Sequence, residues 1–397
     1  MDAFVVDAIR TPRGRGRPGG ALSDLRAAEL LAGLFTEVAG RFPGVDEYAD
    51  DTMIGCATQV GDQGANIGKT ASLLAGWSVA APAATMNRFC ASGLSATSLM
   101  AERAAVQDAV TIAGGVEMMS RTPMLADKGA MFLDPQIAAR LGALQPGVAA
   151  DLVATQFGFS RAECDAYAVL SQERAAAAQD TGRFRSIVPV RDAAGALVLD
   201  RDETIRRTNT LESLAALQPA FTEAAAGRDG EILRGLFPDL PPLNAVHHAG
   251  NSPAMADGAA LVVLASAAAA RRHGLRPRAR ILATAEASVS ITQIGAVDAT
   301  RKALARAGLS AADVDLWEVR DSFAAVTLHY LRELAVPLER FNVNGSSIAL
   351  GHPMGATGAM LVGTLLDEME LRGVDRGVVA ITGAAGVASA AILERVA

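Results

Sequence analysis

The chain has 397 residues, which at about 150 residues per domain suggests two to three domains. Half of the residues are hydrophobic and 20% are charged, which excludes a disordered chain or a small disulfide-stapled fold. The net charge is −7 and no Lys/Arg block occurs, which argues against nucleic acid as the main partner.

The first third of the chain alternates short apolar runs with segments whose small and apolar residues recur at helical spacing. These patterns predict strands at 3–9, 51–55, 83–86 and 109–113, and helices at 22–38, 66–74 and 91–106. The fourth strand runs into Gly114-Gly115, which predicts a tight turn at that point.

The composition changes between Met119 and Ala249, where charged and loop-forming residues are more frequent. Amphipathic helices are expected at 149–157 and 161–181. We interpret this part as an insertion. The apolar composition of the first third returns after Asp257, where GAALVVLAS predicts a buried strand.

The last third repeats the order of the first. It predicts strands at 280–284, at 314–319, in the FNVN segment and from 376, and helices at 300–307 and 359–371. Each part contains a strand, a reactive residue, a small-residue helix, a buried strand and a glycine turn. The reactive residues are Cys90 and His352. Two α/β halves about a pseudo-twofold axis would place them on facing helix starts.

Targeting signals and cysteines point to the reducing cytoplasm. The apolar stretch at the N-terminus is too short for a secretory signal. The uncharged stretch Phe341–Leu366 is long enough for a membrane span, but its asparagines, histidine and glycines favour buried protein interior. Cys56, Cys90 and Cys164 are too few and too scattered for disulfides or zinc. We expect no membrane partner and no metal.

Cys90 follows a strand and opens a helix. The first-turn N–H groups and the helix dipole favour an anion there, which predicts a lowered thiol pKa and a nucleophile. The alternative is a buried small hydrophobe, which describes most free cysteines, including Cys56 and Cys164.

His352 lies between Gly351 and Pro353, in a turn that opens a glycine-rich helix. A histidine there could act as a base or as an oxyanion donor, and the alternative is a capping or buried structural residue. His247 and His248 are adjacent and lack a third ligand at matching spacing, so a metal site is not expected there.

Several blocks of the chain resemble the thiolases, in particular 3-ketoacyl-CoA and acetyl-CoA acyltransferases. They include VVDAIRTPRGRGRPGGALSDL, IGCATQVGDQGANIGKTA, NRFCASGL, AGGVEMMSRTPM, SRAECDAYAVLSQERAAAA, GNSPAMADGAA and NVNGSSIALGHPMGATGAM, and the terminal GAAGVASAAILERV. These blocks occur in family order and cover nearly the whole chain.

The resemblance implies a five-layered αβαβα fold. It has two pseudo-repeated halves, residues 1–118 with 250–272 and residues 273–397, and a loop domain, residues 119–249, that binds CoA. It also implies a homodimer or homotetramer with no permanent cofactor. A coenzyme A thioester would be the substrate, Cys90 would take the acyl group, and His352 would activate the thiol.

Cations for the CoA phosphates would come from the loop domain, where most arginines are expected to be ordinary surface charges. The candidates are Arg183, Arg185, Arg206, Arg207 and Arg228.

The chain departs from the thiolase pattern in its C-terminal loop. Thiolases carry a second cysteine there that moves a proton, and the matching position is Ala380. Thr382 and Ala384 replace glycines. The resemblance gives the Thr382 N–H a role in holding an oxyanion, which a threonine can fill if its φ is negative.

Further departures surround the reaction centre. Arg320 replaces the Asn or His that holds a water or donates to an oxyanion. Arg320 could contact an oxyanion or an acceptor carboxylate, and the alternative is a structural ion pair with Asp321 or Glu117. Near the CoA pantetheine, Pro253 replaces a serine and His248 a small hydroxyl residue. Ser252, Pro253 and His248 are the candidate CoA contacts.

Three functions remain open from the sequence. The first is an acyl-CoA-dependent acyltransferase that works through Cys90 with a non-standard acceptor or acid/base arrangement. The second is a true 3-ketoacyl-CoA thiolase with a rearranged acid/base. The third is a catalytically silent homologue that binds CoA or scaffolds a partner. Loss of one acid/base group typically costs about 10²–10⁴-fold in rate, so an ordinary thiolase cycle is expected to be impaired.

Overall fold

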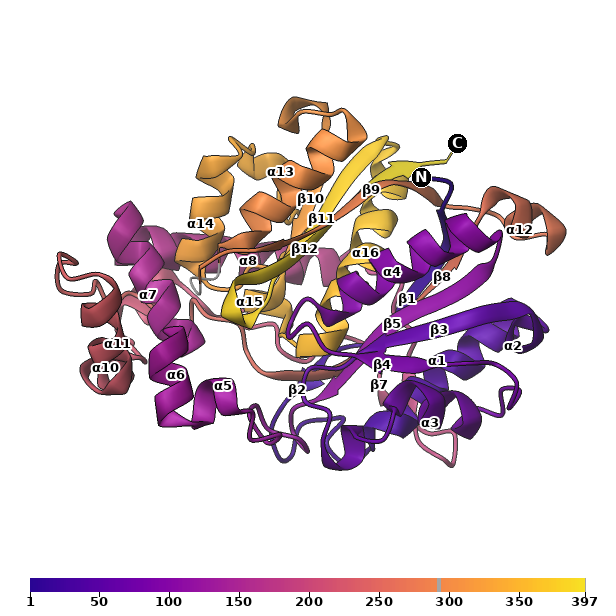
Figure 1. Ribbon diagram of the computed structural model, residues 1–397, viewed down its shortest axis with the longest axis horizontal. Coiled ribbons are helices and arrows are strands. Elements are labelled where there is room, and N and C mark those ends of the chain that lie inside the picture. Colours follow the sequence, from indigo (N-terminus) through magenta and orange to yellow (C-terminus); the bar gives the residue numbers. More distant parts are fainter. Residues whose placement is uncertain (291–293, 397) are drawn as a thin grey trace.

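The computed structural model describes residues 1–290 and 294–396, in which ten strands form one mixed sheet (Figure 1). The order across the sheet is β10, β11, β12, β9, β1, β8, β5, β3 and β4, and β2 pairs with β8. The strands are β1 (Phe4–Arg10), β2 (Gly14–Arg15), β3 (Ala49–Gly55), β4 (Ala84–Met86), β5 (Val110–Met118), β8 (Ala256–Ala265), β9 (Ala279–Ser288), β10 (Leu316–Val319), β11 (Arg376–Thr382) and β12 (Val387–Arg395).

The sheet consists of two half-sheets with the same pairing pattern. In the first, β5 is parallel to β3 and antiparallel to β8, and β8 is antiparallel to β1. In the second, β11 is parallel to β10 and antiparallel to β12, and β12 is antiparallel to β9. The half-sheets meet through β1 and β9, where Phe4 pairs with Arg280 and Val5 with Ala279. The predicted internal repeat is confirmed.

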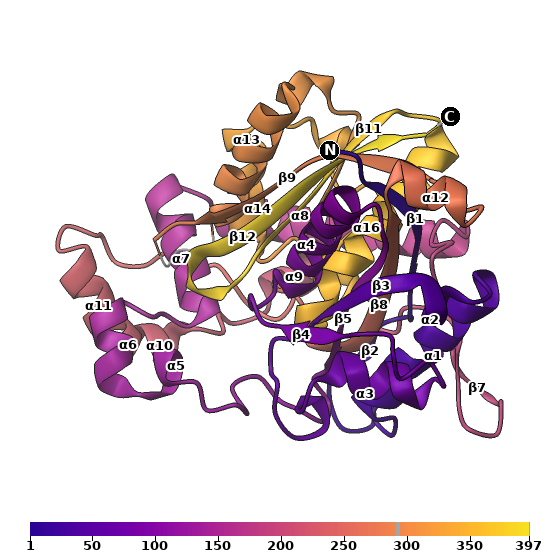
Figure 2. The same ribbon diagram turned by 45° about the vertical axis from the view of Figure 1, so that its right-hand side comes forward.

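Helices complete five layers (Figures 1 and 2). Helices α4 (Ser92–Gln107) and α16 (Met354–Arg372) lie between the half-sheets and pack against strands of both. Helices α1 (Ala27–Arg41) and α3 (Ile67–Leu74) cover the outer face of the first half-sheet. Helix α13 (Gly295–Ala307), with α14 (Ala324–Glu333) beside it, covers the outer face of the second. The expected αβαβα architecture is therefore present.

The two central helices touch through their backbones. A Cβ atom on Gly93 would lie 2.6 Å from the carbonyl oxygen of Gly355, and one on Gly358 would lie 2.5 Å from the backbone N of Leu94. Distances this short leave room for glycine only. Some of the many small residues in the sequence therefore lie at the contact between α4 and α16, where larger side chains would not fit.

The same contact corrects the turn predicted at Gly114-Gly115, because β5 runs straight through both residues to Met118. A Cβ on Gly115 would lie 2.2 Å from the Gly355 carbonyl oxygen. Gly115 lets α16 approach the strand, and neither glycine turns the chain.

The segment from 119 to 255 contributes most of the remaining helices. They are α5 (Ala130–Leu133), α6 (Pro135–Leu141), α7 (Pro146–Phe157), α8 (Arg161–Asp180), α9 (Leu211–Ala215), α10 (Thr222–Ala226) and α11 (Arg228–Leu236). A small hairpin, β6 (Val190–Arg191) with β7 (Leu197–Leu199), lies between α8 and α9. The other short helices are α2 (Val45–Tyr48), α12 (Ala267–Arg272) and α15 (Ser347–Leu350).

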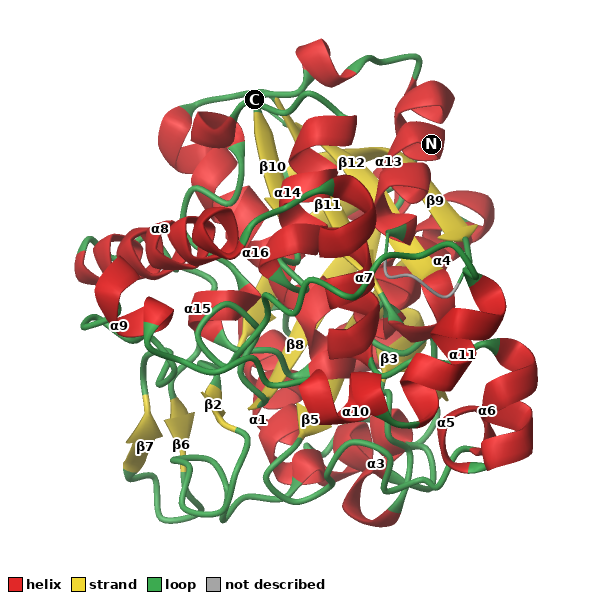
Figure 3. Cartoon of the chain, turned by 90° about the vertical axis from the view of Figure 1, so that its left-hand side faces the viewer, coloured by secondary structure: helices red, strands yellow, loops and turns green. Residues whose placement is uncertain are grey.

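Four of these helices form a unit of their own, which we call the side lobe: α5 and α6 with α10 and α11. They lie beside α7 and away from the main sheet (Figures 1 and 3). An apolar cluster packs α11 against α7 and contains Leu144, Val148, Leu152, Ile232 and Leu233. Helices α10 and α11 are thus anchored on α7, and α5 and α6 pack against each other.

Most other predicted elements are found with shifted ends. Helix α1 begins five residues later than expected, at Ala27, whereas α16 begins at Met354, directly after Pro353. The FNVN segment is not a strand. Phe341 makes a single bridge to Trp317, and the chain then turns because Asn342 adopts a left-handed φ of 44°. In the described residues, no helix is both long and apolar enough to span a membrane.

Candidate active site

Cys90 lies between β4 and α4 in a turn held by side-chain hydrogen bonds. Asn87 Oδ1 accepts from the N–H of Phe89 at 2.7 Å. Ser92 Oγ accepts from the N–H of Arg88 at 2.8 Å and donates to the carbonyl oxygen of Phe89 at 2.6 Å. These bonds hold Phe89 at a φ of 49°, a conformation that costs an L-residue about 1–2 kcal/mol. Local strain therefore presents Cys90 at the helix start.

Cys90 is partly exposed, and its thiol is protonated at neutral pH. Burial raises the pKa of Cys90, while the Arg320 charge and the N–H groups of Cys90 and Ala384 lower it by less. The sequence-based expectation of a lowered pKa is therefore wrong, because lost hydration outweighs the helix start. The thiol needs a base before it can act as a nucleophile.

His352, the candidate base, lies just before α16. Its N–H donates to the carbonyl oxygen of Ala254 at 2.8 Å, and Gly351 before it has a φ of 89°. Nδ1 lies 2.7 Å from Thr357 Oγ1, and Nε2 is buried without a hydrogen-bond partner among the described residues. Burial, then the charges of Arg320 and Arg13, holds the pKa of His352 well below its ordinary value. With Nδ1–H donating to Thr357, Nε2 carries a free lone pair.

Glu117 connects the loop after β3 to the start of α16, a role that the sequence reading missed. Its carboxylate, fully buried in β5, accepts from the N–H of Gly355 at 2.9 Å, that of Ala57 at 2.9 Å and that of Thr58 at 3.1 Å. Gln63 Nε2 donates to it at 2.8 Å. Glu117 therefore fixes the first turn of α16. The signal in the sequence was a lone acid in an otherwise apolar strand.

Arg320 ends β10 as a buried cation. Its Nη1 donates to Ser322 Oγ at 2.9 Å and to the Thr382 carbonyl oxygen at 3.1 Å. Nε has no partner, and no carboxylate of the described chain lies within ion-pair distance of its guanidinium. The expected alternative of an ion pair with Asp321 or Glu117 is therefore wrong. Asp321 instead accepts from the N–H of Ile348 at 2.8 Å.

The C-terminal loop closes the site from β11. Ala380 is fully buried and packs in the apolar cluster of the second half-sheet, and its carbonyl oxygen accepts from the Arg320 N–H at 3.0 Å. Thr382 is not among the residues with positive φ, so it meets the condition for donating its N–H. Ala385 takes the left-handed turn, with a φ of 56°, and Ala384 before it donates to the Cys90 sulfur.

The three candidate CoA residues differ in whether they have a polar atom available to bind a ligand. Ser252 is nearly buried, and its Oγ has no partner among the described residues. Pro253 beside it is half-buried. His248 lies in a closed network, because Nε2 is 2.8 Å from Asp165 Oδ1 and Nδ1 accepts from the Gly250 N–H at 3.0 Å. His248 has no ring nitrogen left for a ligand.

The arginine candidates for the CoA phosphates are mostly engaged within the chain. Arg183 pairs with Glu368 at 2.7 Å, Arg207 with Asp180 at 2.7 Å, and Arg206 donates to the Ala249 carbonyl oxygen at 3.1 Å. Arg228 donates to the carbonyl oxygen of Phe132 at 2.8 Å. Of the five, Arg185 is exposed and its guanidinium has no partner among the described residues.

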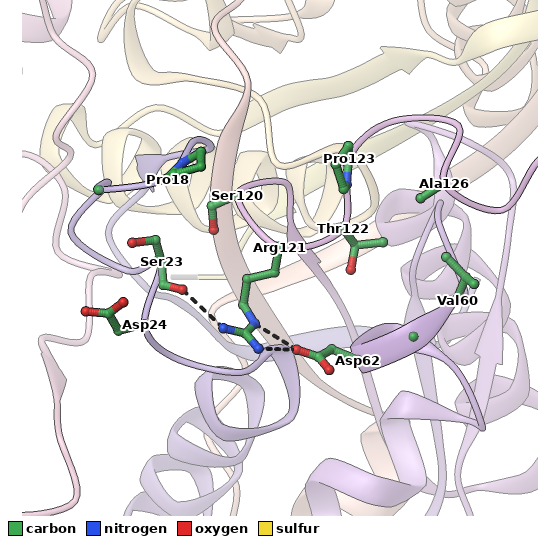
Figure 4. A pocket seen from close by; sticks show the side chains of 12 residues that line it. Pro18, Ser23, Asp24, Val60, Asp62, Ser120, Arg121, Thr122, Pro123 and Ala126 are labelled. Atoms are coloured by element: carbon green, nitrogen blue, oxygen red, sulfur yellow. Dashed lines mark hydrogen bonds and ion pairs between the residues drawn. The ribbon is translucent and has the colours of Figure 1, made fainter.

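Two cavities lie outside the Cys90–His352 centre. The larger, about 610 Å³, is an open basin between loops at 18–24, 60–62 and 120–126, where Arg121 is paired with Asp62 at 2.6 Å (Figure 4). The smaller lies behind Arg320 and measures about 10 Å³, which is room for no more than one water. Neither is lined by Cys90 or His352.

Comparison with known proteins gives consistent matches over the whole chain. The family model for the thiolase N-terminal domain matches residues 3–230, and that for the thiolase C-terminal domain matches residues 275–395. A beta-ketoadipyl-CoA thiolase of Pseudomonas putida is 38% identical, over 100% of both chains. A 3-ketoacyl-CoA thiolase of Erwinia tasmaniensis is 39% identical, over 99% of both chains.

Proposed function

The chain belongs to the thiolase family of acyl-CoA acyltransferases, and we propose that its acyl-enzyme forms on Cys90. Nε2 of His352 takes the thiol proton, and Sγ attacks the thioester carbonyl carbon. The bond from that carbon to the CoA sulfur breaks, and CoA leaves as its thiol with the proton from His352. The N–H groups of Cys90, Ala384 and Thr382 are the proposed donors to the oxyanion.

The observation that carries the finer proposal is the unpaired buried guanidinium of Arg320. A buried cation without a partner is costly, and an arriving anion removes that cost. The methyl group of Ala380 cannot move a proton in the second half of the reaction. We therefore propose a non-standard acceptor or acid/base arrangement, in which Arg320 binds the acceptor carboxylate or the thioester oxyanion.

A second candidate is a true 3-ketoacyl-CoA thiolase. The names of the relatives favour it, and so does His352, whose free and neutral Nε2 could serve in both proton transfers. The third candidate is a silent CoA-binding or scaffolding homologue. The presence of both Cys90 and His352 argues against it, because a binding protein has no need of a nucleophile and a base.

The deciding experiment is intact-mass measurement after incubation with a panel of acyl-CoAs, with Cys90→Ala as the control. We expect one acyl adduct in the wild type and none in the variant. Turnover of that adduct by an added amine, alcohol or carboxylate-bearing acceptor, without cleavage of acetoacetyl-CoA, supports the first candidate. Rapid cleavage of acetoacetyl-CoA supports the second. No adduct from any donor would leave only the silent homologue.

We further propose that residues 119–249 bind CoA, with Ser252 and Pro253 against the pantetheine and Arg185 near the phosphates. A homodimer or homotetramer in the cytoplasm is the proposed assembly. It is supported by β4, which is an edge strand of the sheet, and by Val79 in the preceding loop, which is 84% exposed. Light scattering after size exclusion tests the assembly, and a monomer at micromolar concentration would exclude it.

A further inference from the structure

The side lobe reaches the reaction centre at one aromatic contact. Phe132 of α5 meets Phe89 edge to face, with ring centroids 6.1 Å apart and an interplanar angle of 78°. Phe89 directly precedes Cys90. Phe132, Phe89 and Cys90 are each partly exposed.

Phe89 also borders the C-terminal loop. A Cβ on Gly383 would lie 3.4 Å from the Cβ of Phe89, and the next residue, Ala384, donates to the Cys90 sulfur. Phe132 therefore contacts the residue, Phe89, that lies between Cys90 and the C-terminal loop. No other described aromatic contact joins the side lobe to the turn of Cys90.

The position of Phe132 is fixed from α11. Arg228 Nη1 donates to the Phe132 carbonyl oxygen at 2.8 Å, and Arg228 Nε lies 3.3 Å from Asp229 Oδ1. The buried Asp229 accepts from the N–H of Gln145, at the start of α7, at 2.6 Å. Helix α5 has only four residues and no side-chain cap, and this link ties its backbone at Phe132 to α11 and to the start of α7.

We propose that Phe132 is a specificity-determining residue that limits the bulk of the group reaching the Cys90 sulfur, with Arg228 as its positioning residue. The ring narrows the approach beside Phe89, so acyl groups that are bulky next to the carbonyl carbon are excluded. For acyl transfer this inference rests on the proposed acyl-enzyme. The size limit itself also applies to any reagent that attacks the same sulfur.

Thiol alkylation tests the size limit without acyl-CoA. Cys56 and Cys164 are 0% exposed and burial raises the pKa of both thiols, so Cys90 is the reactive cysteine. We compare iodoacetamide, which is small, with N-phenylmaleimide, which is bulky. Phe132→Ala should raise the maleimide rate relative to the iodoacetamide rate by about tenfold. Phe132→Trp should lower that ratio, which keeps the test usable if the alanine variant folds poorly.

The matched control is Leu133→Ala, because Leu133 is the next residue of α5 and is 47% exposed. It should leave the ratio unchanged. Arg228→Ala should shift the ratio in the same direction as Phe132→Ala but by less, and Arg228→Lys should restore part of it. An unchanged ratio in both Phe132 variants would overturn the inference.

Acylation by straight-chain and α-branched acyl-CoAs extends the test to the reaction. Phe132→Ala should raise the rate with the branched donor relative to the straight one by about tenfold. If the wild type forms no adduct with any donor, the proposed function fails while the alkylation result still stands. If adducts form with the same preference in wild type and variant, only the role of Phe132 fails.

Discussion

The turns before α4 and α16 each place a residue with positive φ directly before the reactive residue, but by different means. Before Cys90, a bulky residue, Phe89, is held in the left-handed region by the hydrogen bond that it donates to Asn87 and the one that it accepts from Ser92. Before His352, Gly351 adopts a φ of 89° with no steric penalty. The two halves therefore share the position at which the helix starts, but the turns before the helices differ in conformation and in sequence.

The two turns differ in charge state as well. Burial raises the pKa of Cys90 and lowers that of His352, so both groups are neutral at pH 7. In the proposed acyl transfer the starting state is therefore a thiol and a neutral imidazole.

Removing the base should give the largest effect. His352→Gln keeps a side chain of similar size but accepts no proton, so acylation of Cys90 should slow by about 10²–10⁴-fold. Rates of adduct formation by mass spectrometry measure this. Thr357→Val, which removes the partner of Nδ1, is the milder companion variant. Acylation within a factor of three of wild type in the glutamine variant would contradict the role of His352.

The glycine turn should tolerate change less well than the turn of Phe89. In Gly351→Ala the new Cβ would lie 2.8 Å from the Ala256 Cβ while φ stays positive, so the free energy of unfolding should fall by about 1–3 kcal/mol. Urea denaturation measures the loss. Gly308→Ala is the control, because φ there is also positive but nothing lies within 4 Å. Equal losses in both would show that packing at Gly351 adds nothing.

Removing the charge of Arg320 should change the pH dependence of acylation. Burial, and after it the Arg320 charge, lowers the pKa of His352, so the imidazole stays neutral well below pH 6.5 in the wild type. Arg320→Met should raise the pKa of His352, and acylation should then be lost at higher pH as the solution is acidified. Arg320→Lys keeps the charge and should keep the wild-type profile. Identical acid limbs in wild type and Arg320→Met would remove this role.

The smallest effect is expected from the polar support of Phe89. Ser92→Ala leaves the partly buried N–H of Arg88 without its acceptor, which should cost about 1 kcal/mol of unfolding free energy. Thermal melting measures it. Ser98→Ala, which removes a hydroxyl bonded within the same helix, is the comparison variant and should cost less. A larger loss at Ser98 would place the support of this turn elsewhere.

Local pattern was enough to predict the strands and helices that carry Cys90 and His352. Apolar runs and small-residue spacing mark them regardless of what they pack against. The continuation of β5 through Gly114-Gly115 was not predictable, because its reason is a carbonyl oxygen of Gly355 about 240 positions later in the chain.

The site shows the same limit. Cys90, His352 and Arg320 could be selected by residue type and motif, but their charge states depend on burial, which local sequence does not reveal. The partners of His248 and Glu117 are likewise distant, at Asp165 and Gly355. Phe132 was missed because only the folded lobe brings it to Phe89.

The backbone contact between α4 and α16 has a consequence for how the protein responds to heat. Side chains normally act as a soft layer that lets helices slide as temperature rises, and here Gly93, Gly355 and Gly358 leave no such layer. The starts of α4 and α16 are therefore in direct backbone contact. The reacting pair should therefore keep its spacing on warming until the central layer itself melts, so that catalytic competence and the fold are lost in a single step.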